Sequence, residues 1–187
     1  MERVLSAALA WKDHPYDASK RDQMLLGEGG TGKSQIIKTI VAGMDLVLRK
    51  QDVILMAPTG AAADNISGST YHTSLGITIA KRQKLTVSER VRKLWSRKTI
   101  MIIDEVSMLD LTSLNLINNQ CKIAKSLDRS SPDLFGGLPV VIFMGDFFQF
   151  PPVKGPALCS QERTERWERR GCKWPDDLAS IQRSDSP

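Results

Sequence analysis

The sequence predicts an α/β fold, a mostly parallel sheet with helices on both faces. Its apolar runs are continuous rather than alternating, which is typical of parallel strands that are buried on both sides. Stretches with apolar residues at helical spacing alternate with these runs. Polar residues gather where the runs end, and this is the edge at which open α/β sheets bind ligands. A ligand site is therefore expected at that edge.

The first predicted unit consists of a strand, a helix and a second strand. A short apolar run at 24–26 predicts the first strand. Apolar residues between Ile36 and Leu48 then recur at helical spacing and predict the helix. The apolar run at 53–56 predicts the second strand.

The second half of the chain repeats this alternation. Further strands are predicted at 100–103 and 140–144. Between them, apolar residues recur every third position from Met108 to Ile117, which indicates a helix packed on the sheet. Residues 126–137 are rich in Ser, Asp, Pro and Gly and are predicted to form a loop before the last strand.

The length of 187 residues fits one domain with irregular ends. We assign residues 1–22 to a helical segment that precedes the domain, a helical lead-in. The apolar residues of this segment suit an amphipathic helix better than a secretory signal. Residues 23–155 form the predicted domain. Residues 156–187 mix both charge signs without apolar periodicity and are predicted to be a poorly ordered tail.

The composition favours an intracellular globular protein. Apolar residues make up 41% and charged residues 25%, and no apolar run approaches the ~20 residues that a membrane span needs. The 3 cysteines are odd in number and lack paired C-x-x-C spacing, which argues against a disulfide framework and a zinc site. With only 2 histidines, any metal is expected to have oxygen ligands, which suits magnesium on a nucleotide.

Residues 27–34, Gly-Glu-Gly-Gly-Thr-Gly-Lys-Ser, fit the phosphate-binding loop (P-loop) G-x-x-x-x-G-K-[ST] between the first strand and helix. Its glycines let backbone N–H groups converge on phosphate oxygens, and the helix N-terminus adds a favourable dipole. Lys33 supplies a cation and Ser34 a magnesium ligand. The predicted nucleotide contacts are Gly27, Gly29, Gly30, Thr31, Gly32, Lys33 and Ser34.

Two carboxylates, Asp104 and Glu105, follow the predicted strand at 100–103. Burying them without partners would be costly, so they suggest a function. In P-loop ATPases the first carboxylate holds magnesium and the next orients the attacking water. The alternative is that Asp104 or Ser107 caps a helix.

A third motif, residues 145–153, follows the last predicted strand. Gln149 would lie near the nucleotide, where it can hydrogen-bond a γ-phosphate and report its loss to the neighbouring aromatic and proline residues. The alternative for Phe147, Phe148 and Phe150 is a core aromatic cluster next to a proline turn.

Residues 57–63 and 68–73 carry hydroxyls and small residues after the strand at 53–56. Such groups suit nucleic-acid phosphates, and Tyr71 or His72 can stack or hydrogen-bond. A turn with a helix cap explains residues 58–63 equally well, and His72 alone fits a structural histidine.

Positive charge concentrates between residues 81 and 98, where Glu89 is the only acid. Such a stretch can contact nucleic-acid phosphates, or it can be the solvated face of a helix. The cations are Lys81, Arg82, Lys84, Arg90, Arg92, Lys93, Arg97 and Lys98.

Taken together and in this order, the motifs at 27–34, 57–63, 68–73, 102–108 and 145–153 resemble the Pif-type DNA helicases of the RecD-like branch of helicase superfamily one. The resemblance covers roughly residues 23–155. It implies a RecA-like P-loop ATPase domain, magnesium-dependent ATP hydrolysis and 5′-to-3′ translocation on single-stranded DNA. It also implies duplex unwinding in DNA repair, recombination and telomere maintenance, in the nucleus or alternatively the mitochondrion.

The resemblance also implies roles for residues. Lys33 and Ser34 match the nucleotide and magnesium contacts, and Gln149 matches the γ-phosphate sensor. Asp104 matches the magnesium carboxylate and Glu105 the hydrolytic one. The positions that match the DNA-binding face are Pro58, Thr59, Gly60 and His72.

The sequence departs from the family pattern in two places. No adenine-recognising Asn and Gln block precedes Met24, and no second RecA-like domain with its arginine finger follows Val153. Such an arginine is worth ~10³ to 10⁵ in rate, so we expect ATP binding with feeble hydrolysis and little unwinding. The chain is then part of a helicase or, alternatively, a catalytically weak nucleotide- and DNA-binding remnant. The Gln149 motif disfavours a ring-forming P-loop ATPase.

Overall fold

A computed structural model describes residues 21–26, 32–47, 49–77, 86–153, 155 and 158, with the backbone alone for 21–26. The predicted tail, apart from Leu158, and nearly all of the predicted lead-in lie outside the described residues. The limits of the domain at 23 and 155 therefore stay predictions.

The described strands form one five-stranded sheet in the order β1-β5-β4-β2-β3, and every pair in it is parallel. This confirms the predicted α/β fold. β1 begins earlier than the predicted strand, because Arg21 already pairs with Val140. β3 was not predicted, since it has 2 residues and both are polar. The strands are β1 (Arg21–Leu26), β2 (Val53–Ala57), β3 (Ser69–Thr70), β4 (Ile100–Ile103) and β5 (Val140–Gly145).

Four of the five described α-helices begin after a residue whose side chain caps the helix N-terminus, and α2 is the exception. Asp110 Oδ1 accepts a hydrogen bond of 2.7 Å from the Ser113 N–H, so α6 starts at Leu111 and not at Met108, which lies in the short helix η2. The α-helices are α2 (Lys33–Leu46), α3 (Gly60–Asn65), α4 (Tyr71–Leu75), α5 (Glu89–Ser96) and α6 (Leu111–Ala124). The 3₁₀ helices are η1 (Lys50–Asp52), η2 (Val106–Met108) and η3 (Leu134–Gly137).

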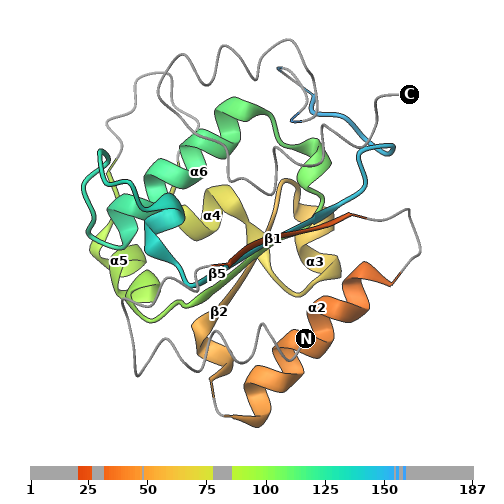
Figure 1. Cartoon of the computed structure of the whole chain (residues 1–187), viewed down its shortest axis with the longest axis horizontal. Coiled ribbons are helices and arrows are strands. Elements are labelled where there is room, and N and C mark those ends of the chain that lie inside the picture. The colour runs from red at the N-terminus through yellow and green to blue at the C-terminus, as the bar shows by residue number, and fades with distance from the viewer. Residues whose placement is uncertain are drawn as a thin grey trace.

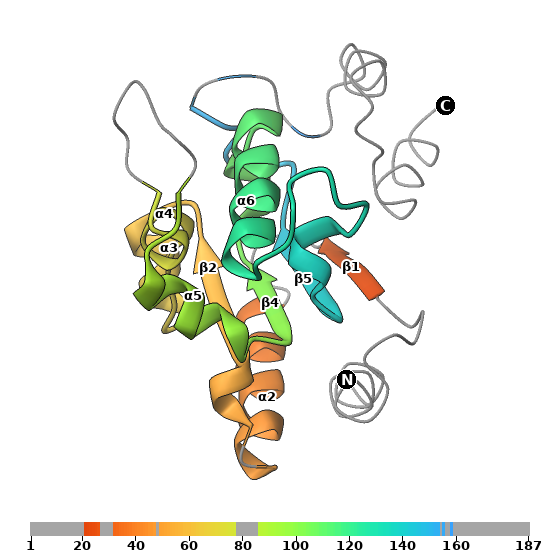
Figure 2. The same cartoon turned by 90° about the vertical axis from the view of Figure 1, so that its left-hand side faces the viewer.

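Helices cover both faces of the sheet, with α2 on one side and α4, α5 and α6 on the other (Figure 1, Figure 2). Ile37, Ile40 and Met44 of α2 pack on alternate residues of β4 and β5, including Ile102 and Ile142. The residues between these, such as Met101 and Phe143, face the larger cluster under α6. All described β4 and β5 side chains are buried, which explains why both runs are continuously apolar.

The predicted loop at 126–137 contains more structure than expected. Its last residues form η3, and the Phe135 ring is buried at 5.5 Å from the Phe143 ring. Within the described residues, no helix combines the length and the apolar character that a membrane crossing requires.

Candidate nucleotide site

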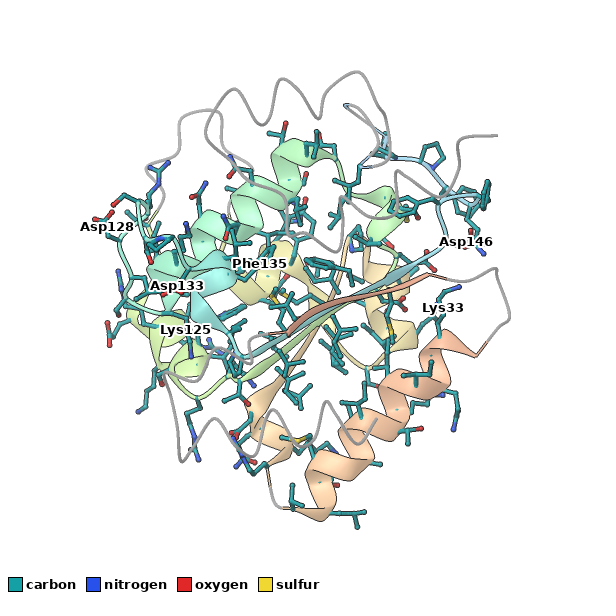
Figure 3. The ribbon with its side chains drawn as sticks, viewed as in Figure 1. Lys33, Lys125, Asp128, Asp133, Phe135 and Asp146 are labelled. Atoms are coloured by element: carbon teal, nitrogen blue, oxygen red, sulfur yellow. The ribbon has the colours of Figure 1, made fainter. Side chains whose placement is uncertain are left out.

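The carboxyl ends of β1, β4 and β5 meet at one edge of the sheet. Leu26 pairs with Gly145, and Ile103 pairs with Phe143, so the residues after these strands emerge close together. Lys33 at the start of α2 and Asp146 after β5 lie at the same end of the sheet (Figure 3). This is the edge at which a ligand site was predicted.

The described part of the phosphate loop forms an open helix N-terminus. Gly32 has a φ of 87° and precedes α2, a conformation that suits glycine. No side-chain cap is present at this N-terminus and the first turn holds no acid, so its N–H groups can face an anion. Ser34 is exposed there. Gly27, Gly29, Gly30 and Thr31 lie outside the described residues.

Asp104 is buried at the end of β4, with 5% of its surface exposed. Burial raises the pKa of its carboxyl group, and the Glu105 N–H bond of 3.0 Å and the charge of Lys33 oppose this shift. Asp104 does not cap a helix, because Asp110 caps α6 and η2 has no side-chain cap. Ser107 is no cap either, since its buried hydroxyl has no hydrogen-bond partner. The capping alternative is therefore wrong for both residues.

Glu105 is held in a left-handed backbone conformation with φ 52° and ψ 44°. This conformation is unfavourable for a residue with a side chain and tends to occur at functional sites. Burial raises the pKa of the Glu105 carboxyl group, and the charges of Asp104 and Asp146 raise it further, whereas Lys33 lowers it. The four charged groups thus lie close enough to influence one another.

Asp146 completes this group and was not among the predicted site residues. It is buried, and its Oδ1 accepts the Phe148 N–H at 3.0 Å while its backbone O accepts the Gln149 N–H at 3.1 Å. These bonds fix the turn that carries Gln149, whose side chain is exposed. The available signal was that Asp146, like Asp104, follows a buried strand.

Gly145 allows β5 to lie close to η2 next to the acidic residues. A Cβ atom at Gly145 would lie 2.9 Å from the Val106 N and 3.0 Å from the Val106 Cγ1. Only glycine fits there without displacing the turn after Glu105.

The residues present fit a magnesium ion held mainly by a nucleotide. Among the described residues, no group of three or more His, Cys, Asp or Glu side chains is arranged to hold a metal alone. Mg²⁺ commonly takes one or two protein oxygens together with phosphate and water. The Asp104 carboxylate and the exposed Ser34 hydroxyl match this donor set.

At the predicted DNA face, the described contacts include structural ones. Thr59 Oγ1 accepts the Ala62 N–H at 3.2 Å and caps α3, as the turn-and-cap alternative states. The His72 ring lies 3.9 Å from the Tyr71 ring, and burial lowers the pKa of its imidazole. Pro58 is partly exposed, and Gly60 is exposed with open space around it. DNA contact by these residues stays a prediction.

The basic stretch divides into structural and exposed cations. Lys98 is buried and donates to Gln51 O at 2.6 Å and Val53 O at 2.9 Å, so it is no DNA contact. Arg92 donates to Ile123 O at 2.9 Å. The exposed cations are Arg90, Lys93 and Arg97. The predicted cations Lys81, Arg82 and Lys84 lie outside the described residues.

The aromatic residues after β5 do not form one cluster. Phe147 packs against the core, as the core alternative states. Phe148 is 93% and Phe150 70% exposed, so that alternative is wrong for them. Val153 is 90% exposed as well, and the three side chains leave an apolar surface beside the candidate site.

Sequence comparisons relate the chain to DNA helicases. The model of the PIF1-like helicase family matches residues 15–167. The ATP-dependent DNA helicase RRM3 of Saccharomyces cerevisiae is 39% identical over 136 residues, which are 68% of this chain and 18% of that protein. The ATP-dependent DNA helicase PIF1 of Danio rerio is 34% identical over 157 residues, 79% of this chain and 23% of that protein. The chain thus spans less than a quarter of either relative.

Solved helicase structures have a similar fold. Bacteroides Pif1 bound to single-stranded DNA has a TM-score of 0.61 at 28% identity, over 90% of this chain and 35% of that chain. Bacteroides Pif1 in complex with ADP-AlF4 has a TM-score of 0.60 at 27% identity, over 90% and 36%. Pif1 of Candida albicans has a TM-score of 0.55 at 32% identity, over 82% and 33%. The RecA-like fold is thereby confirmed.

Proposed function

Because the chain belongs to the PIF1-like helicase family, we propose that it forms the ATP-binding motor domain of an ATP-dependent DNA helicase. The helicase would translocate 5′ to 3′ on single-stranded DNA and unwind duplexes in repair, recombination and telomere maintenance, in the nucleus or the mitochondrion. The relatives are named ATP-dependent DNA helicases, and related Pif1 structures contain ADP-AlF4 or single-stranded DNA.

The observation that carries this proposal is that Lys33, at the start of α2, lies at the same edge of the sheet as the carboxyl end of β4, which Asp104 and Glu105 follow (Figure 3). The open N-terminus of α2 and Lys33 would bind the phosphates of ATP. Ser34 and Asp104 would hold Mg²⁺, which when bound neutralises phosphate charge. Glu105 would orient the attacking water and accept its proton, for which a raised pKa is favourable.

Gln149 would contact the γ-phosphate and link it to the exposed apolar surface. Its N–H bonds to Asp146 O in the turn that also carries Phe148. Loss of the γ-phosphate would therefore move the apolar side chains of Phe148 and Phe150. We propose that a second motor domain packs on them, because side chains exposed by 93% and 70% gain from being covered.

Single-stranded DNA would cross the surface formed by Pro58, Thr59, Gly60 and His72. These residues follow β2 or lie in the first turn of α4, at the same edge of the sheet as the candidate nucleotide site. Backbone amides and hydroxyls there suit phosphate contacts that do not depend on base sequence. A conformational change on ATP hydrolysis would start near Asp104 at the end of β4. It would reach these DNA-facing residues through β2, whose residues 53–56 pair with residues 100–103 of β4.

The proposal is tested by measuring ATP affinity with calorimetry and ATP turnover with and without an oligothymidylate. Lys33→Ala should abolish ATP binding or weaken it strongly, because it removes a cation that contacts phosphate. Glu105→Gln should retain ATP binding and lose turnover, because only the charge that activates water is removed. Unchanged ATP affinity in Lys33→Ala would exclude the loop as the site.

A second candidate is a nucleotide- and DNA-binding module with little catalysis. Among the described residues, no arginine is one of the charged groups that act on Asp104 and Glu105, and an arginine finger would have to come from outside them. ATP binding without turnover, even with the oligothymidylate present, supports this candidate over the motor.

A further inference from the structure

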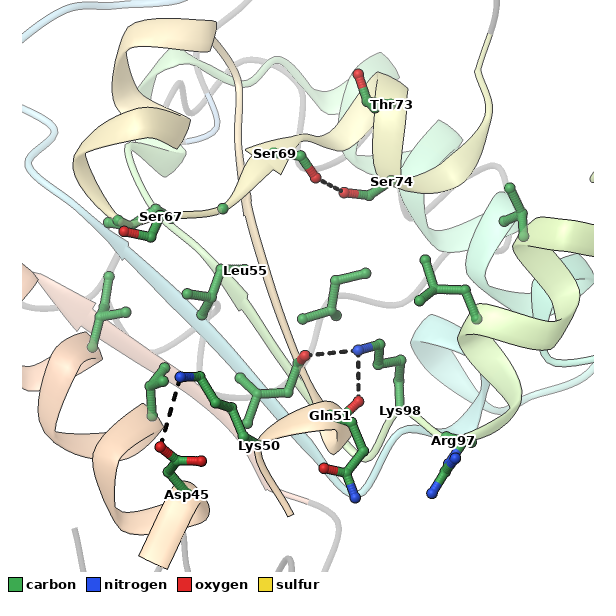
Figure 4. Close-up of a pocket in the computed structure, with 18 of the residues that line it drawn as sticks. Asp45, Lys50, Gln51, Leu55, Ser67, Ser69, Thr73, Ser74, Arg97 and Lys98 are labelled. Carbon is green, nitrogen blue, oxygen red and sulfur yellow. Dashed lines mark hydrogen bonds and ion pairs between the residues drawn. The ribbon is translucent and has the colours of Figure 1, made fainter. Parts of the chain in front are cut away.

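A groove of about 1320 Å³ runs along the edge of the sheet beside β2 (Figure 4). Its walls come from α2 and η1 on one side, and from β3, α4 and α5 on the other. It shares no lining residue with the group of Lys33, Asp104, Glu105 and Asp146. The groove is thus separate from the candidate nucleotide site.

The surface of the groove is mainly aliphatic. Val41, Leu55, Ile66 and Leu94 contribute to it, and Leu94 is 47% exposed. Among the described lining residues there is no Phe, Tyr or Trp. A nucleic-acid strand usually stacks its bases on such rings, whereas aliphatic surface suits the apolar side chains of a protein.

The rim of the groove is positively charged. The exposed cations that line it come from α2, η1, α5 and the residue after α5: Lys38, Lys50, Arg90, Lys93 and Arg97. The only carboxylate among the described lining residues is Asp45, and it lies 3.7 Å from Lys50 Nζ. The rim therefore complements an occupant with several negative charges.

Lys98 limits how an occupant can bind. β3 pairs only with Met56 and Ala57 of β2, which leaves the start of β2 without a strand neighbour on that side. There the Lys98 ammonium group donates to the Gln51 and Val53 carbonyl oxygens (Figure 4). Because an added strand would have to displace this buried lysine, the occupant must bind through side chains.

We propose that this groove binds an acidic segment of a partner protein, with aliphatic side chains in the groove and carboxylates along the rim. The aliphatic surface without aromatic rings favours a protein over a nucleic acid. The excess of rim cations favours an acidic segment over a neutral one. This binding does not require ATP, so it stands or falls separately from the proposed helicase function.

The experiment selects a phage-displayed peptide library on the full chain. The expected peptides combine Asp or Glu with Leu, Ile or Val, and the best one is then labelled for fluorescence anisotropy at about 0.1 M salt. Arg97→Glu should weaken its binding by about 5- to 10-fold, because a rim charge is reversed. Leu94→Ser should weaken it by about 3-fold or more, because apolar contact is lost.

Matched controls alter similar side chains outside the groove. Arg129→Glu reverses an exposed cation after α6, and Leu46→Ser truncates a leucine that is 86% exposed and does not line the groove. Both should bind the peptide as the unaltered chain does. All four substituted residues are at least partly exposed, and circular dichroism checks that each variant is folded.

Several results would overturn the proposal. Enrichment of neutral or basic peptides alone would refute acidic-segment binding. Equal affinity of the acidic peptide for Arg97→Glu, Leu94→Ser and the two control variants would also refute it. If an oligothymidylate displaces the peptide and loses affinity in Arg97→Glu, the groove is a nucleic-acid surface. Failure to enrich any peptide on the folded chain also refutes the proposed binding of an acidic protein segment. None of these outcomes bears on ATP binding at Lys33.

Discussion

Glycine at position 105 should make the folded protein more stable than alanine at the same position. Glu105 has φ 52° and ψ 44°, close to the centre of the left-handed region. A residue with a Cβ atom pays about 1–2 kcal/mol there, and glycine does not. The greater conformational freedom of glycine in the unfolded chain lowers the free energy of unfolding by about 0.5–1 kcal/mol relative to alanine. The difference between the midpoints of these two ranges favours Glu105→Gly over Glu105→Ala by about 0.75 kcal/mol.

The comparison of Glu105→Gly with Glu105→Ala isolates the backbone effect, because both variants lack the carboxylate. Urea unfolding measures the free energy difference, and thermal unfolding should show the glycine variant about 1–4 °C higher. Ala42→Gly, at an exposed position within α2, is the control and should lower stability by about 1 kcal/mol. If Glu105→Gly unfolds at the same urea concentration as Glu105→Ala or a lower one, the strain argument is refuted.

Three further predictions concern Asp104, Gly145 and Trp95. Burial raises the pKa of Asp104, so the free energy of unfolding falls as the pH rises from the ordinary Asp pKa to the raised pKa of the folded state. Asp104→Asn should therefore raise Tm at pH 7, and a gain equally large at pH 4 would contradict this. Gly145→Ala should cost about 1–3 kcal/mol in urea unfolding and weaken ATP binding, because the new Cβ lies 2.9 Å from the Val106 N; unchanged values would refute the close contact. Trp95→Phe should cost about 1–3 kcal/mol, because the Trp95 indole N–H that bonds the Ser74 carbonyl at 2.9 Å is lost; no change in urea unfolding would contradict this.

The strands and the acidic pair could be predicted because their signals are local. β2, β4 and β5 are continuous apolar runs, so their burial on both faces follows from the sequence. Asp104 and Glu105 directly follow such a run. Parallel strands bring such residues to one edge of the sheet. Asp146 also comes after a buried apolar strand. It was not predicted as a site residue, because within the motif at 145–153 only Gln149 was assigned a role.

Other features depend on contacts between distant parts of the chain. Lys98 belonged to a basic stretch that suggested DNA contact, yet it bonds to Gln51, which is 47 positions away. The same stretch contains Arg90 and Arg97, which line the groove beside β2. Composition cannot separate a buried cation from an exposed one, because burial is decided by which elements pack around each side chain.

The sequence by itself determined the chemistry of the site: a glycine-rich loop with Lys33 and Ser34, and two carboxylates after a buried strand. Each of these signals is a fixed spacing of residue types within one short segment. Only the tertiary structure decided the left-handed backbone of Glu105, the third carboxylate at Asp146 and the groove along the open sheet edge. Strand order, backbone strain and burial arise from contacts between segments, and no local pattern records them.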